Sequence, residues 1–321
     1  MDVPRPTPAA PSDELLELVQ LLRRELRRRD EAVTGNWVEE TSNELHRGTK
    51  VGWYLPVATG GGLAFYSVEE HDAFGHVHVG PGPDAVERGD RLATTMLDAL
   101  PSDVESIDVG FTGLTADDER VLMGRLARRP GSRIIERYKM ERALGPADEE
   151  ALPPLPSGVT LVPIRAVTVE AMADLDRRSF AGTVDELLIG PSLADYEEML
   201  RALLDGKLGR FVDEASTAII ESEPPRLVGA LLTGEESPQR AIFLDFMVDP
   251  NDRGHGYGRF LFRWGIRALR ALGYSSVRLW VTSSNEPARR LYEAEGLRTS
   301  VLASIYRWDR PETGPHPQTS R

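Results

Sequence analysis

The sequence predicts an α+β protein of two tandem domains, each with a mixed, mostly antiparallel sheet flanked by helices. Its length of 321 residues suits two domains of ordinary size. Segments typical of strands and helices follow one another in the same order in both halves of the chain. Residues 146–158, which are rich in proline and alanine, separate the halves and are typical of a linker.

The first predicted domain, residues 1–145, opens with an amphipathic helix over Ser12–Val33. Ser12 is a suitable N-cap, and Asp13 and Glu14 stand in the first turn, where the helix dipole favours negative charge. Strands and helices then alternate. Strands are predicted at Val51–Ala58, Leu63–Glu69, His76–Val79, Ser106–Phe111 and within Ser132–Leu144, and helices at Arg88–Leu100 and Asp117–Arg128.

The second predicted domain, residues 159–310, has the same order of elements and is followed by a tail, residues 311–321. Strands are predicted at Val159–Ala166, Gly209–Ser216, Arg226–Gly234, Ala241–Val248, Ser276–Thr282 and up to Trp308, and helices at Thr168–Phe180, Ser192–Leu204, Gly256–Leu272 and Glu286–Glu295.

The two halves align at a nearly constant offset. Pro81 matches Pro250, Arg88 matches Arg253, and Tyr138 matches Tyr306, at offsets of 169, 165 and 168 residues. A steady offset of this length indicates duplication of a whole domain rather than a short repeat. The alternative is a coincidence between two unrelated α+β domains.

The composition excludes several classes of protein. Hydrophobic residues make up 40% of the chain, which supports packed cores, and no apolar run approaches the about 20 residues that span a bilayer. No signal peptide pattern opens the sequence. The net charge of −13 repels nucleic acid, and the absence of cysteine excludes thiolate metal sites. We expect a cytoplasmic protein, monomeric or homodimeric, without a nucleic-acid, membrane or metal partner.

One segment of the second domain is typical of an anion-binding site. A predicted strand ends at Val248, a turn holds Pro250, and a helix opens near Gly256. The first turn of a helix has unpaired N–H groups and partial positive charge, and glycines let the backbone approach an anion closely. This arrangement predicts a cradle for a diphosphate, flanked by Arg253 and Arg259.

Two other phosphate-binding patterns do not fit. A dinucleotide fold needs G-x-G-x-x-G directly after the first strand of a parallel unit, whereas these glycines come late in the domain. A P-loop needs lysine and then serine or threonine after its last glycine, and neither follows Gly258.

The segment resembles motif A of the GNAT superfamily of acyl-CoA N-acyltransferases, Arg/Gln-x-x-Gly-x-Gly/Ala, which Arg253, Gly256 and Gly258 match. Residues 285–297 resemble motif B, Asn-x-x-Ala-x-x-x-Tyr-x-x-x-Gly-Phe, with Leu297 in place of phenylalanine. The resemblance covers residues 159–309. The length and the predicted pair of GNAT-like domains also resemble the relatives of mycothiol synthase, in which a degenerate GNAT domain accompanies an active one.

The resemblance implies an N-acetyltransferase that uses acetyl-CoA as cosubstrate and a small-molecule amine or a peptide N-terminus as acceptor. CoA would lie in a V-shaped opening between Ala241–Val248 and Ser276–Thr282, and loop 181–192 would line the acceptor pocket. Tyr292 would protonate the leaving thiolate, since a phenol holds its proton at neutral pH. The predicted cofactor-binding residues are Phe246, Met247, Val248, Arg253, Gly254, His255, Gly256, Tyr257, Gly258, Arg259 and Asn285.

The resemblance leaves the general base open. Many family members have a glutamate six residues before the valine that ends this strand, and here that residue is Ile242. Asp245 is the carboxylate of the strand, but strand alternation puts it on the face opposite to Ile242. It would face the acceptor only if a β-bulge reverses the parity. Asp245 is therefore either the catalytic base or a residue that pairs with an arginine or caps a loop.

The first half departs from motif A over residues 79–93. Arg91 stands where Gly256 stands in the second half, and Glu87 and Asp90 bring negative charge to where a phosphate would lie. The segment near Leu122 that corresponds to motif B has no tyrosine at the acid position. We expect this half to be structural or to shape the acceptor site. The alternative function is a non-catalytic acyl-CoA-binding or regulatory module.

Overall fold

The chain folds into two compact units in the computed structural model. The N-terminal unit holds Met1–Glu136 and Ala303–Arg321, and the C-terminal unit holds Arg137–Leu302. The structure describes residues 4–10, 12–28, 44–45, 47, 50–69, 71–149, 152, 154–155, 157–190, 192–207, 209–223 and 225–311. The end of the predicted first helix and nearly all of the predicted tail lie outside these residues.

The N-terminal unit is built on a mostly antiparallel sheet. Helix α1 begins as predicted, because the Ser12 hydroxyl accepts a hydrogen bond from the Leu15 N–H at 3.1 Å. The elements are β1 (Thr7–Pro8), α1 (Asp13–Arg28), β2 (Val51–Leu55), β3 (Gly62–Glu69), β4 (Asp72–Val79), α3 (Ala85–Asp98), β5 (Ser106–Thr112), α4 (Ala116–Leu126) and the start of β6 (Ser132–Ala143). Strands β4 and β5 are parallel over seven residue pairs, from Asp72 opposite Ser106 to His78 opposite Thr112.

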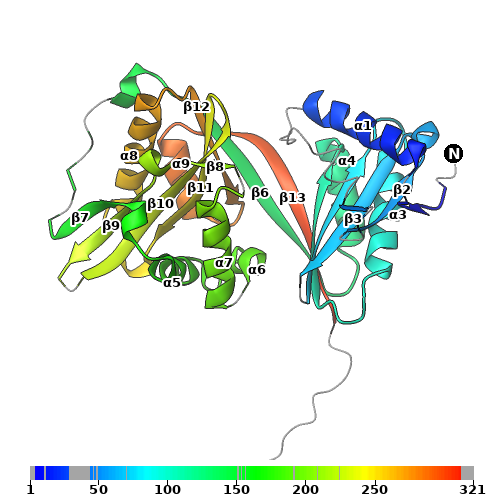
Figure 1. Cartoon of the computed structure of the whole chain (residues 1–321), viewed down its shortest axis with the longest axis horizontal. Coiled ribbons are helices and arrows are strands. Elements are labelled where there is room, and N and C mark those ends of the chain that lie inside the picture. The colour runs from blue at the N-terminus through cyan, green and yellow to red at the C-terminus, as the bar shows by residue number, and fades with distance from the viewer. Residues whose placement is uncertain are drawn as a thin grey trace, which may run out of the picture. The chain divides into compact units, whose positions relative to one another are not determined.

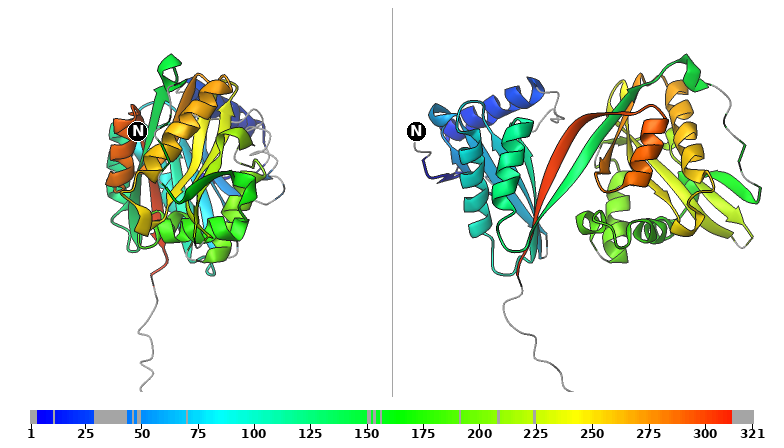
Figure 2. Two further views of the ribbon diagram at one scale, coloured as in Figure 1. Left: turned by 90° about the vertical axis from the view of Figure 1, so that its left-hand side faces the viewer. Right: turned by 180° about the vertical axis from the view of Figure 1, so that it is seen from behind.

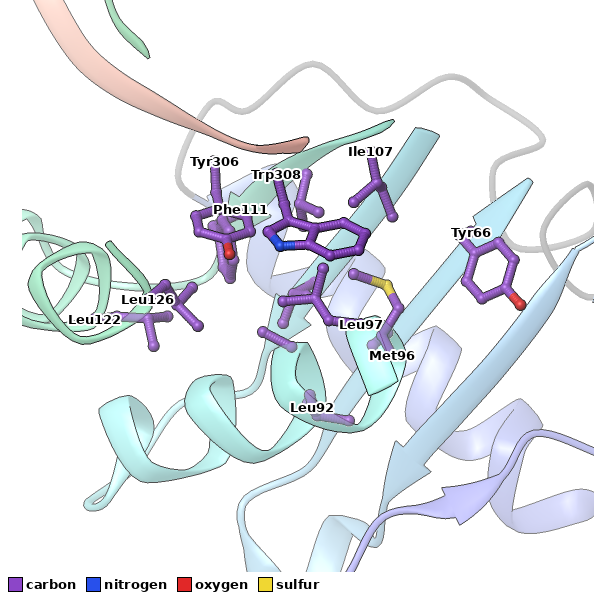
Figure 3. Packing of buried hydrophobic residues seen from close by; sticks show 14 of the residues in the cluster. Tyr66, Leu92, Met96, Leu97, Ile107, Phe111, Leu122, Leu126, Tyr306 and Trp308 are labelled. Atoms are coloured by element: carbon purple, nitrogen blue, oxygen red, sulfur yellow. The ribbon is translucent and has the colours of Figure 1, made fainter. Parts of the chain in front are cut away.

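Both faces of this sheet are covered by helices. Along β3, Leu63 and Phe65 pack against α1, whereas Ala64 and Tyr66 belong to the core under α3 and α4. Figure 3 shows this second core, in which Tyr306 and Trp308 from the last strand point toward the two helices. The alternation is the period-two pattern that a strand with both faces buried requires.

The C-terminal unit repeats the arrangement. Its elements are β7 (Val159–Pro163), α5 (Val169–Phe180), α6 (Glu186–Ile189), α7 (Leu193–Leu204), β8 (Arg210–Phe211), β9 (Thr217–Ser222), β10 (Pro225–Ser237), β11 (Arg240–Val248), α8 (Tyr257–Ala271), β12 (Ser276–Thr282), α9 (Glu286–Ala294) and most of β13 (Arg298–Asp309). The sheet order is β7-β9-β10-β11-β12-β6, with β8 beside β10. Only the β11–β12 pairing is parallel within this described order.

Helix α8 packs on one face of this sheet, and α5 and α7 pack on the other (Figures 1 and 2). Leu231 of β10 and Phe243 of β11 face α8, whereas Leu232 and Met247 face α5 and α7. The fold class predicted from the sequence is confirmed. Strand β9 was missed, since the sequence indicated one strand over Gly209–Ser216 where the structure has a short strand and a turn of 3-10 helix.

The ends of two strands belong to different units. Residues Arg137–Ala143 of β6 pair with β12 in the C-terminal unit, and Ile305–Asp309 of β13 pair with β5 in the N-terminal unit. The unit boundary therefore falls between Glu136 and Arg137, whereas the sequence placed the domain boundary in residues 146–158. Hydrogen bonding to a neighbouring strand, which chain order does not reveal, decides which sheet a strand end joins.

Candidate active site

The turn between β11 and α8 forms an open cradle. Gly254 and Gly256 have φ values of 85° and 88°, in the left-handed region that glycine tolerates. A Cβ atom added at either position would have no heavy atom within 4 Å, so both glycines face open space. Gly256 is the N-cap of α8 and provides no side-chain cap, which leaves the first N–H groups of the helix for an anion.

A buried carboxylate fixes this turn from behind. Asp249, 1% exposed, accepts a hydrogen bond from the Asn251 N–H at 2.9 Å and forms ion pairs with Arg178 and Arg226. Arg253 donates to the Ser179 carbonyl oxygen at 2.8 Å, which ties the cradle to helix α5. These contacts hold the backbone of the turn in one conformation before any ligand binds.

The cradle opens into a cavity of about 770 Å³. Most of the predicted cofactor-binding residues line it: Phe246, Val248, Arg253, Gly254, Gly256, Tyr257, Gly258, Arg259 and Asn285. Met247 and His255 do not. Met247 is buried under α5 and α7 because strand alternation turns it away, and the exposed His255 ring lies 3.1 Å from the Asp252 carbonyl oxygen. Arg259 is also paired with Glu295, at 3.0 Å.

Strands β11 and β12 separate beside this cavity. Their parallel pairing runs from Arg240 opposite Ser276 to Phe243 opposite Leu279 and goes no further. At that point β11 has a β-bulge, since Leu232 of β10 lies opposite Asp245 and the next residue, Thr233, lies opposite Phe243. The bulged residue is Leu244. Backbone groups of β11 beyond the bulge therefore have no partner from β12, as the V-shaped opening requires.

The bulge decides where Asp245 points. It places Asp245 on the face of β11 that carries Met247, so the carboxylate faces helix α5. There its carboxyl lies beside that of Asp176, which is 0% exposed on α5, and neither Asp176 oxygen has a hydrogen-bond partner among the described residues. Two ionised carboxylates buried side by side repel each other, so this arrangement favours keeping a proton on one of them.

Burial sets the acidity of this pair. Desolvation raises the pKa of Asp245 to about 6, opposed by the neighbouring Asp176 carboxyl and by the hydrogen bond from the Phe246 N–H, at 2.7 Å. The pKa of Asp176 lies well above its usual range, because of burial and of the neighbouring Asp245. Because burial raises the pKa of both carboxyls, and that of Asp176 further, Asp176 keeps a proton more readily and Asp245 is the candidate general base.

Tyr292 reaches the same opening from the other face of the sheet. It is 6% exposed on α9, and its ring packs against Phe246 and Phe262, with ring centroids 6.0 and 5.9 Å away. Burial raises its pKa further above 10, aided by Asp245 and Asp185, so the hydroxyl stays protonated at neutral pH. Asn285 caps α9, accepting a hydrogen bond from the Ala288 N–H at 3.3 Å, and it also lines the cavity.

A second cavity of about 100 Å³ lies at the strand separation. Tyr292, Phe246 and Asn285 line both cavities, so the two cavities adjoin at these residues. The smaller one, called the acceptor cavity below, is also lined by Arg137, Phe180, Asp185, Leu244, Asp245, Trp280 and Thr282. Asp185 comes from the loop over residues 181–192 and accepts a hydrogen bond from the Thr282 hydroxyl.

Sequence reasoning missed Asp176 and Arg137. Asp176 is an acidic residue on the buried side of an amphipathic helix, which is unusual and was the available signal. Arg137 was assigned to the first domain, and the sequence holds no sign of its place beside Thr282. Among the described residues no group of three His, Asp or Glu side chains is arranged to hold a metal, and no helix is long and apolar enough to cross a membrane.

The segment that holds this site resembles known proteins. Residues 172–297 match the acetyltransferase (GNAT) family. The mycothiol acetyltransferase of Frankia alni is 28% identical over 241 residues, 72% of this chain and 68% of that protein. A shorter match of 67 residues with the mycothiol acetyltransferase of Frankia casuarinae is 43% identical and covers 20% of that protein.

The fold is also found in a solved structure. A GCN5-related N-acetyltransferase from Sphaerobacter thermophilus matches with a TM-score of 0.65 and 17% identity, over 97% of this chain and 98% of that one. The matched segment contains the cradle, the bulged strand, Asp176, Asp245 and Tyr292. Residues 172–297, which lie within the C-terminal unit, therefore resemble the GNAT acetyltransferase family.

Proposed function

We propose that the C-terminal unit transfers an acetyl group from acetyl-CoA to a small-molecule primary amine by direct attack. One observation carries this proposal: Asp245 and Tyr292 reach the gap between β11 and β12 from opposite faces of one sheet. A base and an acid on two sides of a gap suit a reaction in which one proton leaves the nucleophile and another joins the leaving group.

Each part of the site has one role in the proposed reaction. The cradle at Gly254 and Gly256 binds the diphosphate of acetyl-CoA, and the unpaired edge of β11 binds its pantetheine arm. Asp245 takes a proton from the acceptor ammonium, and the neutral nitrogen then forms a bond to the acetyl carbon. The carbon–sulfur bond breaks with its electron pair on sulfur, and the Tyr292 hydroxyl protonates that thiolate. The new amide nitrogen gives up its extra proton, which restores the Tyr292 hydroxyl.

The relatives named mycothiol acetyltransferase favour a small-molecule amine as acceptor over a peptide N-terminus. The alternative of a non-catalytic acyl-CoA-binding module has no support from the comparisons. A cytoplasmic location and a monomeric or homodimeric state are kept as predictions of the sequence.

The test is release of free CoA from acetyl-CoA with a panel of primary amines, measured for the full chain and for Asp245→Asn. We expect turnover by the full chain and a loss of about a hundredfold or more in kcat/KM at pH 7 for the variant. The loss should shrink toward pH 9, where more of the amine is already neutral. Full activity of Asp245→Asn across pH 6 to 9 would remove Asp245 from the mechanism.

A further inference from the structure

Arg137 places a positive charge in the acceptor cavity. It lies opposite Thr282, at the end of the β6–β12 pairing in the C-terminal unit, and its side chain lines the cavity with Asp185 and Asp245. Its Nε atom is buried without a hydrogen-bond partner. Among the described residues, no acceptor lies within hydrogen-bond or ion-pair distance of the guanidinium.

Other arginines of the C-terminal unit show how a guanidinium is normally satisfied. Arg142, on the same strand, donates to the Glu295 carbonyl oxygen at 2.6 Å and pairs with Asp148. Arg226 pairs with Glu221 at 2.8 Å and with Asp252 at 2.5 Å. A guanidinium has five N–H donors, and burying it without acceptors costs free energy that the fold recovers only when a ligand supplies them.

The charges around Arg137 do not satisfy it. Burial lowers the pKa of Arg137, whereas the negative charge of Asp185 raises it. No ion pair joins them, however, and the Asp185 carboxylate is engaged by the Thr282 hydroxyl. Asp245 accepts a hydrogen bond from the Phe246 N–H and lies beside Asp176. A simple ammonium ion would balance the negative charge of the cavity and still leave the donors of Arg137 without an acceptor.

The chemistry that fits is a carboxylate beside an amine. A planar guanidinium binds a carboxylate through two parallel hydrogen bonds. The cavity of about 100 Å³ corresponds to roughly three water molecules, the size of a short amino-acid head group. Such a head group would present its amine to Asp245 and its carboxylate to Arg137, both of which line this cavity.

We propose that the acceptor carries a carboxylate next to its reacting amine and that Arg137 binds this carboxylate. The acceptor is then an amino acid or a compound with an amino-acid head group. This inference rests on the proposed function, since it assigns the acceptor for the same acetyl transfer.

The kinetic test compares three matched acceptors with the full chain: an α-amino acid, its carboxamide and the amine that lacks the carboxyl group. We expect kcat/KM for the acid to exceed that for the amide by about a hundredfold, the effect of one charge-assisted pair. Arg137→Met should abolish this preference and leave the KM for acetyl-CoA unchanged. Equal rates with the acid and the amide would overturn the inference and leave the proposed function standing.

A stability test separates a ligand-binding arginine from a structural one. Arg137→Met should leave the ligand-free chain as stable as the parent or more so, because no partner is lost. Arg142→Met is the matched control on the same strand and should lower stability, because it removes the ion pair with Asp148 and the donor to the Glu295 carbonyl oxygen. Urea unfolding measures both. A loss for Arg137→Met as large as that for Arg142→Met would overturn the inference.

Binding decides the outcome if no acceptor turns over. N-acetylglycine, a product of the proposed class, should raise the melting temperature of the CoA-bound parent and leave that of Arg137→Met unchanged. Absence of this shift in the parent would overturn the inference. If calorimetry shows no acetyl-CoA binding, the proposed function fails, and the same shift measured without CoA decides the carboxylate site by itself.

Discussion

The two units share one order of elements and differ at the place where we propose that the C-terminal unit binds acetyl-CoA. In the N-terminal unit, β4 and β5 stay paired over seven residues, whereas β11 and β12 separate after four. The N-terminal sheet thus keeps its hydrogen bonds where the C-terminal sheet leaves a backbone edge free. The two units therefore differ in whether the parallel strands stay paired to their ends or separate and leave backbone groups for a ligand.

The cradles differ as well. In the N-terminal unit the side chain of Arg88, 1% exposed, fills the turn and donates to the carbonyl oxygens of Gly80 at 2.6 Å and Pro83 at 2.5 Å. The corresponding Arg253 lies at the edge of an open cavity. The Arg88 guanidinium occupies the turn and satisfies its carbonyl oxygens, so the N-terminal turn needs no ligand to be stable.

The largest expected effect breaks the cradle of the C-terminal unit. Gly256→Glu places a side chain on a backbone with φ of 88° and a carboxylate where the diphosphate binds. We expect acetyl-CoA affinity to fall by about a thousandfold or more. Arg91→Glu, at the corresponding N-terminal position, should leave the affinity for acetyl-CoA unchanged.

Calorimetry with acetyl-CoA measures both variants and the stoichiometry. One site per chain is expected, lost in Gly256→Glu and kept in Arg91→Glu. Two comparable sites in the parent would end the distinction between the units.

Tyr292 sharpens the comparison, because no tyrosine stands at the corresponding position near Leu122. Tyr292→Phe keeps the ring contacts with Phe246 and Phe262 and removes the hydroxyl. We expect kcat to fall about a hundredfold with little change in the KM for acetyl-CoA, since an acid acts on charge that develops only during the reaction. Steady-state kinetics with saturating amine measure it, and near-normal kcat would leave Tyr292 a packing residue.

The two arginines of the cradles should respond oppositely. Arg88→Met leaves the Gly80 and Pro83 carbonyl oxygens without their donors, and we expect stability to fall by about 2 kcal/mol, with acetyl-CoA binding unchanged. Arg253→Met should weaken acetyl-CoA binding more than it lowers stability. Urea unfolding and calorimetry on both variants check this, and a parallel response of the two would contradict the comparison.

The smallest expected effect concerns Asp176, whose carboxyl faces Asp245, with Asp185, Tyr196 and Tyr292 as the further titratable neighbours. Asp176→Asn keeps a donor to Asp245, so the acid limb of kcat/KM should stay near pH 6 and the rate should fall only a few-fold. Asp176→Leu removes the donor and should move that limb to higher pH by about one unit. A pH–rate profile that is the same for both variants would show that Asp176 does not act through Asp245.

The same pair predicts how stability changes with pH. The folded pKa of Asp176 lies above its unfolded value, so folding keeps a proton that the unfolded chain gives up above about pH 4. The free-energy cost of keeping Asp176 protonated in the folded chain is absent below that pH and grows above it. Asp176→Asn should therefore gain stability over the parent at pH 7 and show less of that gain at pH 4, as measured by urea unfolding at both values.

The sequence predicted the parts of the site that depend on local order. Gly256, Tyr292 and the strand–turn–helix follow from motifs that are contiguous in the chain, and the structure brings them to one cavity. The position of Asp245 was conditional on a bulge, because parity along a strand can be read but a bulge at Leu244 cannot. Arg137 depends on which sheet a strand end joins, and long-range pairing leaves no local pattern.

The shared strands β6 and β13 bear on synthesis of the chain. The N-terminal unit includes Ala303–Arg321, so its sheet lacks its last strand until the ribosome has added residues 305–309. Until then the edge of β5 and the apolar residues that pack on Tyr306 and Trp308 are uncovered. A nascent chain in this state exposes a sheet edge and an open core, and both are sites for chaperone binding or for aggregation.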